Sequence, residues 1–206
     1  YSNNYATAPN LTVQTASGLT KYIVYMNGTS TTITESSAAS LGQWYHYAVV
    51  RSGTTVTIYR DGVSTGSVSY SGNVGNSAAT QYIGYDAYYI SRSYISNFRV
   101  VKGTAVYTSA FTPSTSPLQA IANTSVLTCQ SPNFVDNSGN NFAVTVTGSP
   151  KVQKYNPFNI TTLSTPYYGA YFDGNGDYLS LASNAAFTFG TGDFTIEGWI
   201  YTGNTS

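Results

Sequence analysis

The sequence predicts an all-β protein, an antiparallel β-sandwich of the jelly-roll type. Many short segments rich in Thr, Val, Ile and Tyr follow one another, and Gly, Asn and Ser turns separate them. Asp61-Gly62 joins two alternating segments, and an Asp-Gly pair in this setting indicates a hairpin with a type I′ turn. No segment forms a convincing helix. These observations favour two packed sheets of short strands.

The expected strands follow the chain at short spacings. They are residues 11–16, 20–26, 30–36, the hairpin 44–60, and then 63–70, 81–86, 94–103, 125–130, 141–148, 167–174, 177–182 and 193–201. Two stretches interrupt the series. Pro113 and Pro117 lie in residues 103–124, which we expect to be a surface connection, and the proline-containing stretch 149–166 reads as a linker.

The strand that starts at Trp44 carries bulky side chains on both faces, so we expect it to lie in the centre of a sheet rather than at an edge. Alternation places Trp44, His46, Ala48 and Val50 on one face, which we take as the core face. The expected core residues are Trp44, Ala48, Val50, Val56, Ile58, Phe98, Val100, Phe194 and Ile196.

Composition excludes several classes of function. The chain has 206 residues, a net charge of zero and 8% charged residues, far below the roughly 25% of typical domains. It has no basic run, which argues against nucleic-acid binding, and no apolar stretch long enough to span a membrane. A surface whose solubility depends on hydroxyls and amides suits an assembled or extracellular protein.

Three segments resemble laminin-G-like domains of the concanavalin-A-like jelly-roll superfamily, of the kind found in tandem in phage and bacterial surface proteins. The opening of such a domain is similar to AYFDGNGDYLSLASNAAFTFGTGDFTIEGWIY, residues 170–201. Its middle is similar to LGQWYHYAVVRSGTTVTIYRDGVSTG, residues 41–66, and its end to residues 94–118 and 123–152. The resemblance implies a sandwich fold and an extracellular location at a cell surface or on a virion.

The opening motif comes last in this chain, so the motif order indicates a permuted or array-phased domain. Residues 1–152 resemble a sandwich without its first strands, 153–166 a linker, and 167–206 the opening strands of the same or a neighbouring copy. The chain is then a window on a tandem array, a subunit whose last strands complete a neighbour, or a unit that closes on itself. Because an incomplete sandwich exposes apolar surface and unpaired edges, some completion is required, and we favour a neighbour.

The residues that could carry catalysis are few. Retaining glucanases of the superfamily need two carboxylates about 5 Å apart. This chain has two glutamates, Glu35 and Glu197, on segments far apart in sequence, and we expect Glu197 to be an exposed strand residue. His46 is the only histidine, and its strand face favours a hydrogen-bonded core residue over a base. We therefore expect no enzymatic activity.

We expect no cofactor. Asp173 and Asp177 alternate with glycines and Asn175 like the start of a Ca²⁺ loop, but no glutamate closes the loop, and a glycine-rich turn explains the same residues. Calcium is retained as the alternative.

The tyrosine-rich segment 82–94 is the candidate ligand-binding site. Flat aromatic rings beside polar groups suit either sugar rings or a protein contact, and a structural role explains them too. The candidate residues are Tyr85, Asp86, Tyr88, Tyr89 and Arg92.

We expect a non-enzymatic structural and adhesive domain of an extracellular fibre or virion appendage, with phage as one source. Its partners would be copies of itself or neighbouring repeats, together with surface glycans. The alternative is a carbohydrate-binding lectin or adhesin domain of a bacterial cell surface, and a glycan-cleaving enzyme ranks last.

Overall fold

The computed structural model describes residues 11–15, 21–26, 31–74, 79–85, 92–158 and 167–203. Within these ranges the regular structure is strands and one short 3-10 turn, η1 (Ala185–Phe187). The strands are β1 (Leu11–Thr15), β2 (Tyr22–Met26), β3 (Thr31–Thr34), β4 (Trp44–Ser52), β5 (Thr55–Arg60), β6 (Val63–Ser69), β7 (Gln81–Ile83), β8 (Ser93–Lys102), β9 (Thr124–Thr128), β10 (Val144–Thr147), β11 (Lys151–Gln153), β12 (Gly169–Phe172), β13 (Tyr178–Leu181) and β14 (Phe194–Thr202). The predicted all-β fold is confirmed.

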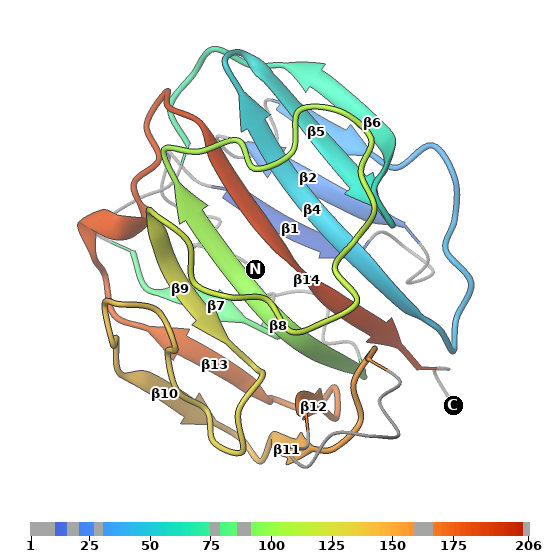
Figure 1. Cartoon of the computed structure of the whole chain (residues 1–206), viewed down its shortest axis with the longest axis vertical. Helices are drawn as coiled ribbons and strands as arrows, with labels where there is room; N and C mark the ends of the chain where they lie inside the picture. Colours follow the sequence, from blue (N-terminus) through green and yellow to red (C-terminus); the bar gives the residue numbers. More distant parts are fainter. Residues whose placement is uncertain are drawn as a thin grey trace.

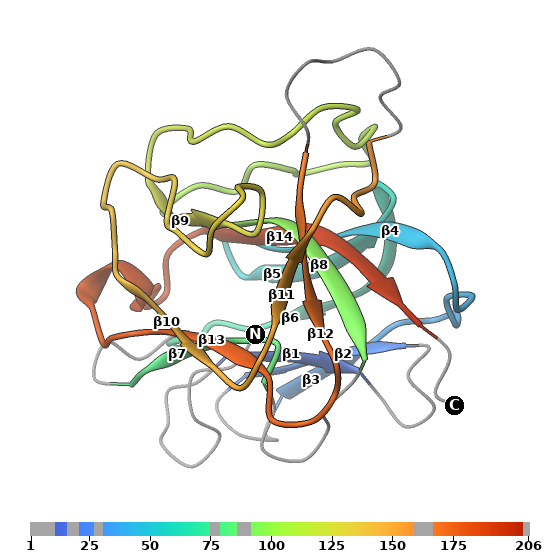
Figure 2. The same ribbon diagram turned by 90° about the horizontal axis from the view of Figure 1, so that it is seen from below.

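The strands form two layers (Figures 1 and 2). One layer is the main sheet, whose order is β11-β12-β8-β14-β4-β5-β6, with β9 paired to β8 beside this path. The other layer consists of two three-stranded sheets, β1-β2-β3 and β10-β13-β7. Figure 2 shows both small sheets beneath the main sheet. All pairs are antiparallel, as a jelly-roll sandwich requires.

A single large apolar cluster fills the space between the layers. It contains Val24 and Met26 from the first small sheet, Leu179 from the second, and Val49 and Phe194 from the main sheet. Because all three sheets contribute to this cluster, the described strands of the two layers pack around one shared core. Burial of this apolar surface is the main driving force for the fold.

Ala48 and Val50 of β4 are buried, as predicted, but their face is not the one that points into the large cluster. Tyr47 and Val49 point into the large cluster, whereas Ala48 and Val50 form a second, smaller cluster on the opposite side of the main sheet with Tyr59. Trp44 is only half-buried. Both faces of β4 are bulky, so alternation separates the faces but does not tell which one points inward. The other predicted core residues lie in the large cluster: Val56, Ile58, Phe98, Val100, Phe194 and Ile196.

The predicted turn at Asp61-Gly62 is confirmed. The φ angles are 49° at Asp61 and 78° at Gly62, and both central residues of a type I′ turn need positive φ. The turn joins β5 to β6, and a second turn with Gly53 at φ 60° joins β4 to β5. β4, β5 and β6 therefore form a continuous meander.

The C-terminal strands complete the chain's own sheet, contrary to our preference for a neighbour. β14 lies between β8 and β4 and pairs with both along its length, from Phe194 opposite Arg51 and Lys102 to Tyr201 opposite Trp44 and Tyr94. In Figure 1 it runs through the middle of the main sheet. β12 pairs with the first residues of β8, and β13 is the central strand of a small sheet. The physical demand for completion is met here within the chain.

The two irregular stretches behave differently. Residues 103–123 contain no strand, as expected, but they cover part of the main sheet (Figure 1). The expected linker begins with a short edge strand, β11, which pairs with β12, and its residues 159–166 lie outside the described residues. The part of the chain that the structure describes holds no helix that could cross a membrane.

Candidate functional site

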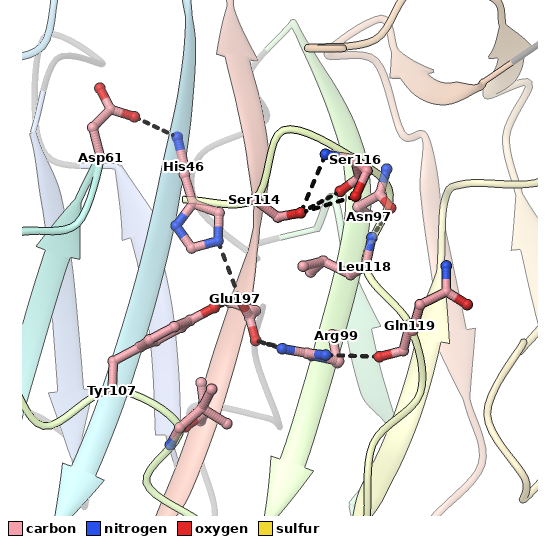
Figure 3. A network of polar contacts seen from close by, with 12 residues as sticks. His46, Asp61, Asn97, Arg99, Tyr107, Ser114, Ser116, Leu118, Gln119 and Glu197 are labelled. Atoms are coloured by element: carbon pink, nitrogen blue, oxygen red, sulfur yellow. Dashed lines mark hydrogen bonds and ion pairs between the residues drawn. The ribbon is translucent and has the colours of Figure 1, made fainter. Parts of the chain in front are cut away.

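A buried polar network surrounds Glu197 on the outer face of the main sheet, the face turned away from the small sheets (Figure 3). Arg99 donates from Nε and Nη2 to Glu197 Oε1, at 2.9 and 2.6 Å. Oε2 accepts from Tyr107 Oη at 2.8 Å and lies 3.1 Å from His46 Nε2. Each carboxylate oxygen therefore has two polar contacts, both from Arg99 at Oε1 and one each from Tyr107 and His46 at Oε2.

Strand register brings these side chains together. Glu197 of β14 lies directly opposite Arg99 of β8 on one side, and Trp199 lies opposite His46 of β4 on the other. Tyr107 comes from the connection 103–123, which lies over the three strands. The Gln119 carbonyl of the same connection accepts a hydrogen bond from Arg99 Nη1 at 2.7 Å. The network exists only because β14 stands between β4 and β8.

The network keeps Glu197 ionised. Burial alone would raise the pKa of Glu197, but the hydrogen bond with His46 and the charge of Arg99 outweigh it and leave the pKa lowered. Because an ionised carboxylate only accepts, His46 Nε2 is the donor. Burial, followed by the charge of Glu197, raises the pKa of Tyr107. Arg99, Tyr107 and His46 all contact Glu197, and Glu197 and His46 are 2% and 0% exposed.

The expectation of an exposed Glu197 was wrong, whereas the hydrogen-bonded core role of His46 is confirmed. A sequence signal existed. Glu197 is the single charge of β14, Arg99 lies between the apolar Phe98 and Val100 of β8, and buried charges of opposite sign are normally paired.

The second glutamate lies on the other side of the main sheet. Glu35 follows β3, is 1% exposed, accepts from the Tyr22 backbone N–H at 2.7 Å through Oε2, and lies 3.4 Å from Arg60 Nη1 through Oε1. Burial is the largest influence on Glu35 and leaves its pKa raised. The sheet separates Glu35 from Glu197, so the two do not form a carboxylate pair across one sugar.

The aspartates of the candidate calcium turn bind backbone. Asp177 accepts from the N–H groups of Ser149 at 2.6 Å and Asp173 at 3.1 Å, and Asp173 accepts from Asn175 at 2.7 Å. These are turn contacts. Among the described residues, no group of three or more His, Cys, Asp or Glu side chains could hold a metal ion.

The described residues of the candidate segment 82–94 lie at its two ends, 82–85 and 92–94. Tyr85 packs against Tyr82 and Tyr178 on the β7 and β13 side, with ring centroids 5.4 and 4.9 Å away. Arg92 is exposed and precedes β8 in the main sheet. Asp86, Tyr88 and Tyr89 lie outside the described residues. The predicted binding role of these residues stays a prediction.

A larger aromatic cluster, not anticipated from the sequence, lies on the outer face of the main sheet. Cross-strand pairing places Trp44 beside Tyr201, Tyr201 beside Tyr94, and Tyr94 beside Tyr171. Tyr155 follows β11 and contacts three of these four rings. We call these five residues the outer-face aromatic row. Alternation places each ring on a strand face, but only the register between four strands distant in sequence aligns them.

The rings of the row hold one another in place. Ring centroids are 5.7 Å apart for Trp44 and Tyr201, 5.8 Å for Tyr94 and Tyr201, and 4.8 Å for Tyr94 and Tyr171. Tyr155 lies 4.7 Å from Tyr94 and 5.2 Å from Tyr201. Four of the rings are half-buried, and Tyr155 is 40% exposed. Partial burial and the neighbouring Tyr201 raise the pKa of Tyr155 to about 12.

Comparison with known protein families gives a match over the first part of the chain. The laminin G-type family model of the Concanavalin A-like lectin/glucanases superfamily matches residues 2–115, more than half of the chain. No curated protein and no solved structure matches the chain. The match agrees with the two-layer antiparallel sandwich and with the resemblance seen in the sequence.

Proposed function

Because the chain belongs to the concanavalin A-like lectin/glucanases superfamily, we propose that it is a non-catalytic structural and adhesive domain of an extracellular fibre or virion appendage that contacts surface glycans. The observation that supports this most is the state of Glu197. Its two oxygens are occupied by Arg99, Tyr107 and His46, and it is 2% exposed. A carboxylate in this state stabilises a sheet and meets no substrate.

The arrangement of the two glutamates argues against glycoside hydrolysis. Hydrolysis with retention needs two carboxyl groups about 5 Å apart on either side of one bond, and inversion needs them roughly 6.5–9.5 Å apart. Glu35 and Glu197 are both buried, on opposite sides of the main sheet. His46 adds no accessible base because its ring is 0% exposed.

Contact with glycans would also fit a lectin, which is the second candidate function. The outer-face aromatic row offers half-exposed rings with polar hydroxyls, and such side chains suit ligands with one apolar and one polar face. A bacterial cell-surface lectin would use this surface as its main function. A fibre domain would use it for attachment and would also contact copies of itself or neighbouring repeats.

Two measurements test the proposal together. Purified protein is incubated with a panel of plant, algal and bacterial polysaccharides, and both reducing-end release and retention on immobilised glycans are recorded. We expect retention without turnover. Turnover that disappears in Glu197→Gln would overturn the non-catalytic assignment, and the absence of any retention would overturn glycan contact. Sedimentation at increasing concentration then separates the candidates, since a fibre domain self-associates and a lectin need not.

A further inference from the structure

We propose that the outer-face aromatic row is the glycan-binding surface and that its ligand is an acidic polysaccharide, a pyranose chain bearing carboxylate or sulfate groups. This inference rests on the glycan contact proposed above and specifies its location and ligand class. The row lies outside the segment 82–94 except for Tyr94.

The row has the shape of a platform for a short sugar chain. Its four cross-strand rings come from β4, β14, β8 and β12, and adjacent strands lie about 4.8 Å apart, so the row is roughly 14 Å long. The C–H groups on one side of a pyranose carry partial positive charge and match the negative face of an aromatic ring. The ring contacts fix the platform before binding, which lowers the entropic cost of association.

Cationic residues lie beside the part of the row that Tyr94 and Tyr171 form. Lys151 of β11 is directly opposite Tyr171 and exposed, so both side chains emerge on the outer face. The Arg92 carbonyl accepts from the Gly203 N–H at 3.4 Å, which extends the β8–β14 ladder and places Arg92, two residues before Tyr94, on the same face. Lys154 is exposed and adjoins Tyr155.

These cations have no partner of opposite charge within the described part of the chain. The ion pairs found there involve Arg60 and Arg99 and the only histidine. The strands that carry the row and Lys151 contain one acid, Glu197, which Arg99 neutralises. In a chain with eight lysines and arginines in total, three exposed cations beside one aromatic platform make a local positive field that attracts an anionic chain.

The test measures binding of the full chain to two matched probes. Hexagalacturonate carries a carboxylate on each sugar, and its fully methyl-esterified form is neutral with the same ring geometry. A sulfated galactan hexasaccharide serves as the sulfate-bearing probe. We expect both acidic probes to bind more tightly than the ester, with a preference that decreases as salt is added. The tighter acidic probe identifies the acid group.

Variants locate the site. Tyr155→Ala should weaken binding at least about tenfold, equivalent to 1.4 kcal/mol, as expected for an aromatic contact at the centre of an interface. Tyr178→Ala, in the aromatic group of the opposite layer, is the matched control and should bind as the wild type does. Lys151→Gln combined with Arg92→Gln should reduce the preference for acid over ester at least about threefold without affecting folding. Lys21→Gln, in the small-sheet layer, is the charge control.

The outcomes are distinct. If the wild type binds glycans and Tyr155→Ala binds equally well, the location is wrong while the proposed function stands. If the ester binds as tightly as the acid, the acidic ligand class is wrong. If no glycan binds, the proposed contact and this inference both fail. If no glycan binds and Tyr155→Ala changes the sedimentation coefficient, the row is a contact between proteins and the inference is overturned.

Discussion

The outer face of the main sheet has two halves that the same three strands build in different ways. In the covered half, β4, β14 and β8 present His46, Glu197 and Arg99, all at most 5% exposed beneath the connection 103–123. In the open half, the same strands present Trp44, Tyr201 and Tyr94, all half-buried. Neighbouring positions on one sheet face therefore serve different purposes.

The difference arises from the irregular connection and not from the strands. The connection is pinned where Val106 N–H donates to Thr195 Oγ1 at 2.9 Å and Leu118 N–H donates to Asn97 Oδ1 at 2.8 Å. Asn97 has a φ of 56° and interrupts the regular ladder of β8. Beneath the connection 103–123, the charged groups of Glu197 and Arg99 are paired with each other. Beyond it, aromatic rings pack against their neighbours and stay accessible.

Removal of the carboxylate should break the covered half. We expect Glu197→Ala to lower the free energy of unfolding by about 3–5 kcal/mol, because Arg99 then stays buried without a counter-charge. Denaturant unfolding followed by tryptophan fluorescence measures the loss. The double variant Glu197→Leu with Arg99→Met removes both charges and should recover most of it. A Glu197→Ala protein as stable as the wild type would show that the network contributes little.

The sequence predicted much of the fold and little of the site, for a physical reason. Strand positions and the turn at Asp61-Gly62 depend on local alternation and backbone preference, which short segments carry themselves. The partners of Glu197 and the alignment of Trp44 with Tyr94 depend on the register of β14 between strands about 100 or more residues away in sequence. Alternation alone also does not tell which face of β4 points inward, because the connection 103–123, which has no regular structure, buries the opposite face.

A comparison of two glycines should show how tightly the connection 103–123 packs against the turn between β5 and β6. A Cβ added to Gly62 would lie 1.7 Å from the Phe111 carbonyl oxygen, whereas one added to Gly53 would meet nothing within 4 Å. Both glycines have positive φ, 78° and 60°, so both substitutions carry the same backbone strain of about 1–2 kcal/mol. We expect Gly62→Ala to cost about 1–3 kcal/mol more than Gly53→Ala. Equal losses in denaturant unfolding would mean that the connection yields easily.

The two glutamates should respond to acid in opposite directions. The lowered pKa of Glu197 means that its stabilisation is complete above the ordinary glutamate pKa and is lost as the pH falls through the folded-state pKa. Glu35 has a raised pKa, so its contribution becomes more favourable as the pH falls from its folded-state pKa towards the ordinary value.

Unfolding free energies measured at a series of pH values separate the two effects. Glu35→Gln should remove the gain on mild acidification and leave the loss at lower pH in place. If Glu35→Gln leaves the profile unchanged, the Arg60 contact compensates for the burial of Glu35 and the contrast between the two carboxyls disappears.

The smallest effect on stability is expected in the open half. Tyr155 is 40% exposed and extends from the end of an edge strand, so Tyr155→Ala should lower the free energy of unfolding by less than about 1 kcal/mol.

The counterpart of Tyr155 in the covered half is Phe111, which stacks on Tyr107 with ring centroids 3.6 Å apart. Phe111→Ala should cost about 2 kcal/mol, below the roughly 3–5 kcal/mol of a fully buried ring. If Tyr155→Ala destabilises as much as Phe111→Ala, the row is a second core and its rings are explained by folding alone. A small loss for Tyr155 instead leaves five clustered aromatic rings whose accessible surface contributes little to stability, and binding is then the simplest reason for their alignment.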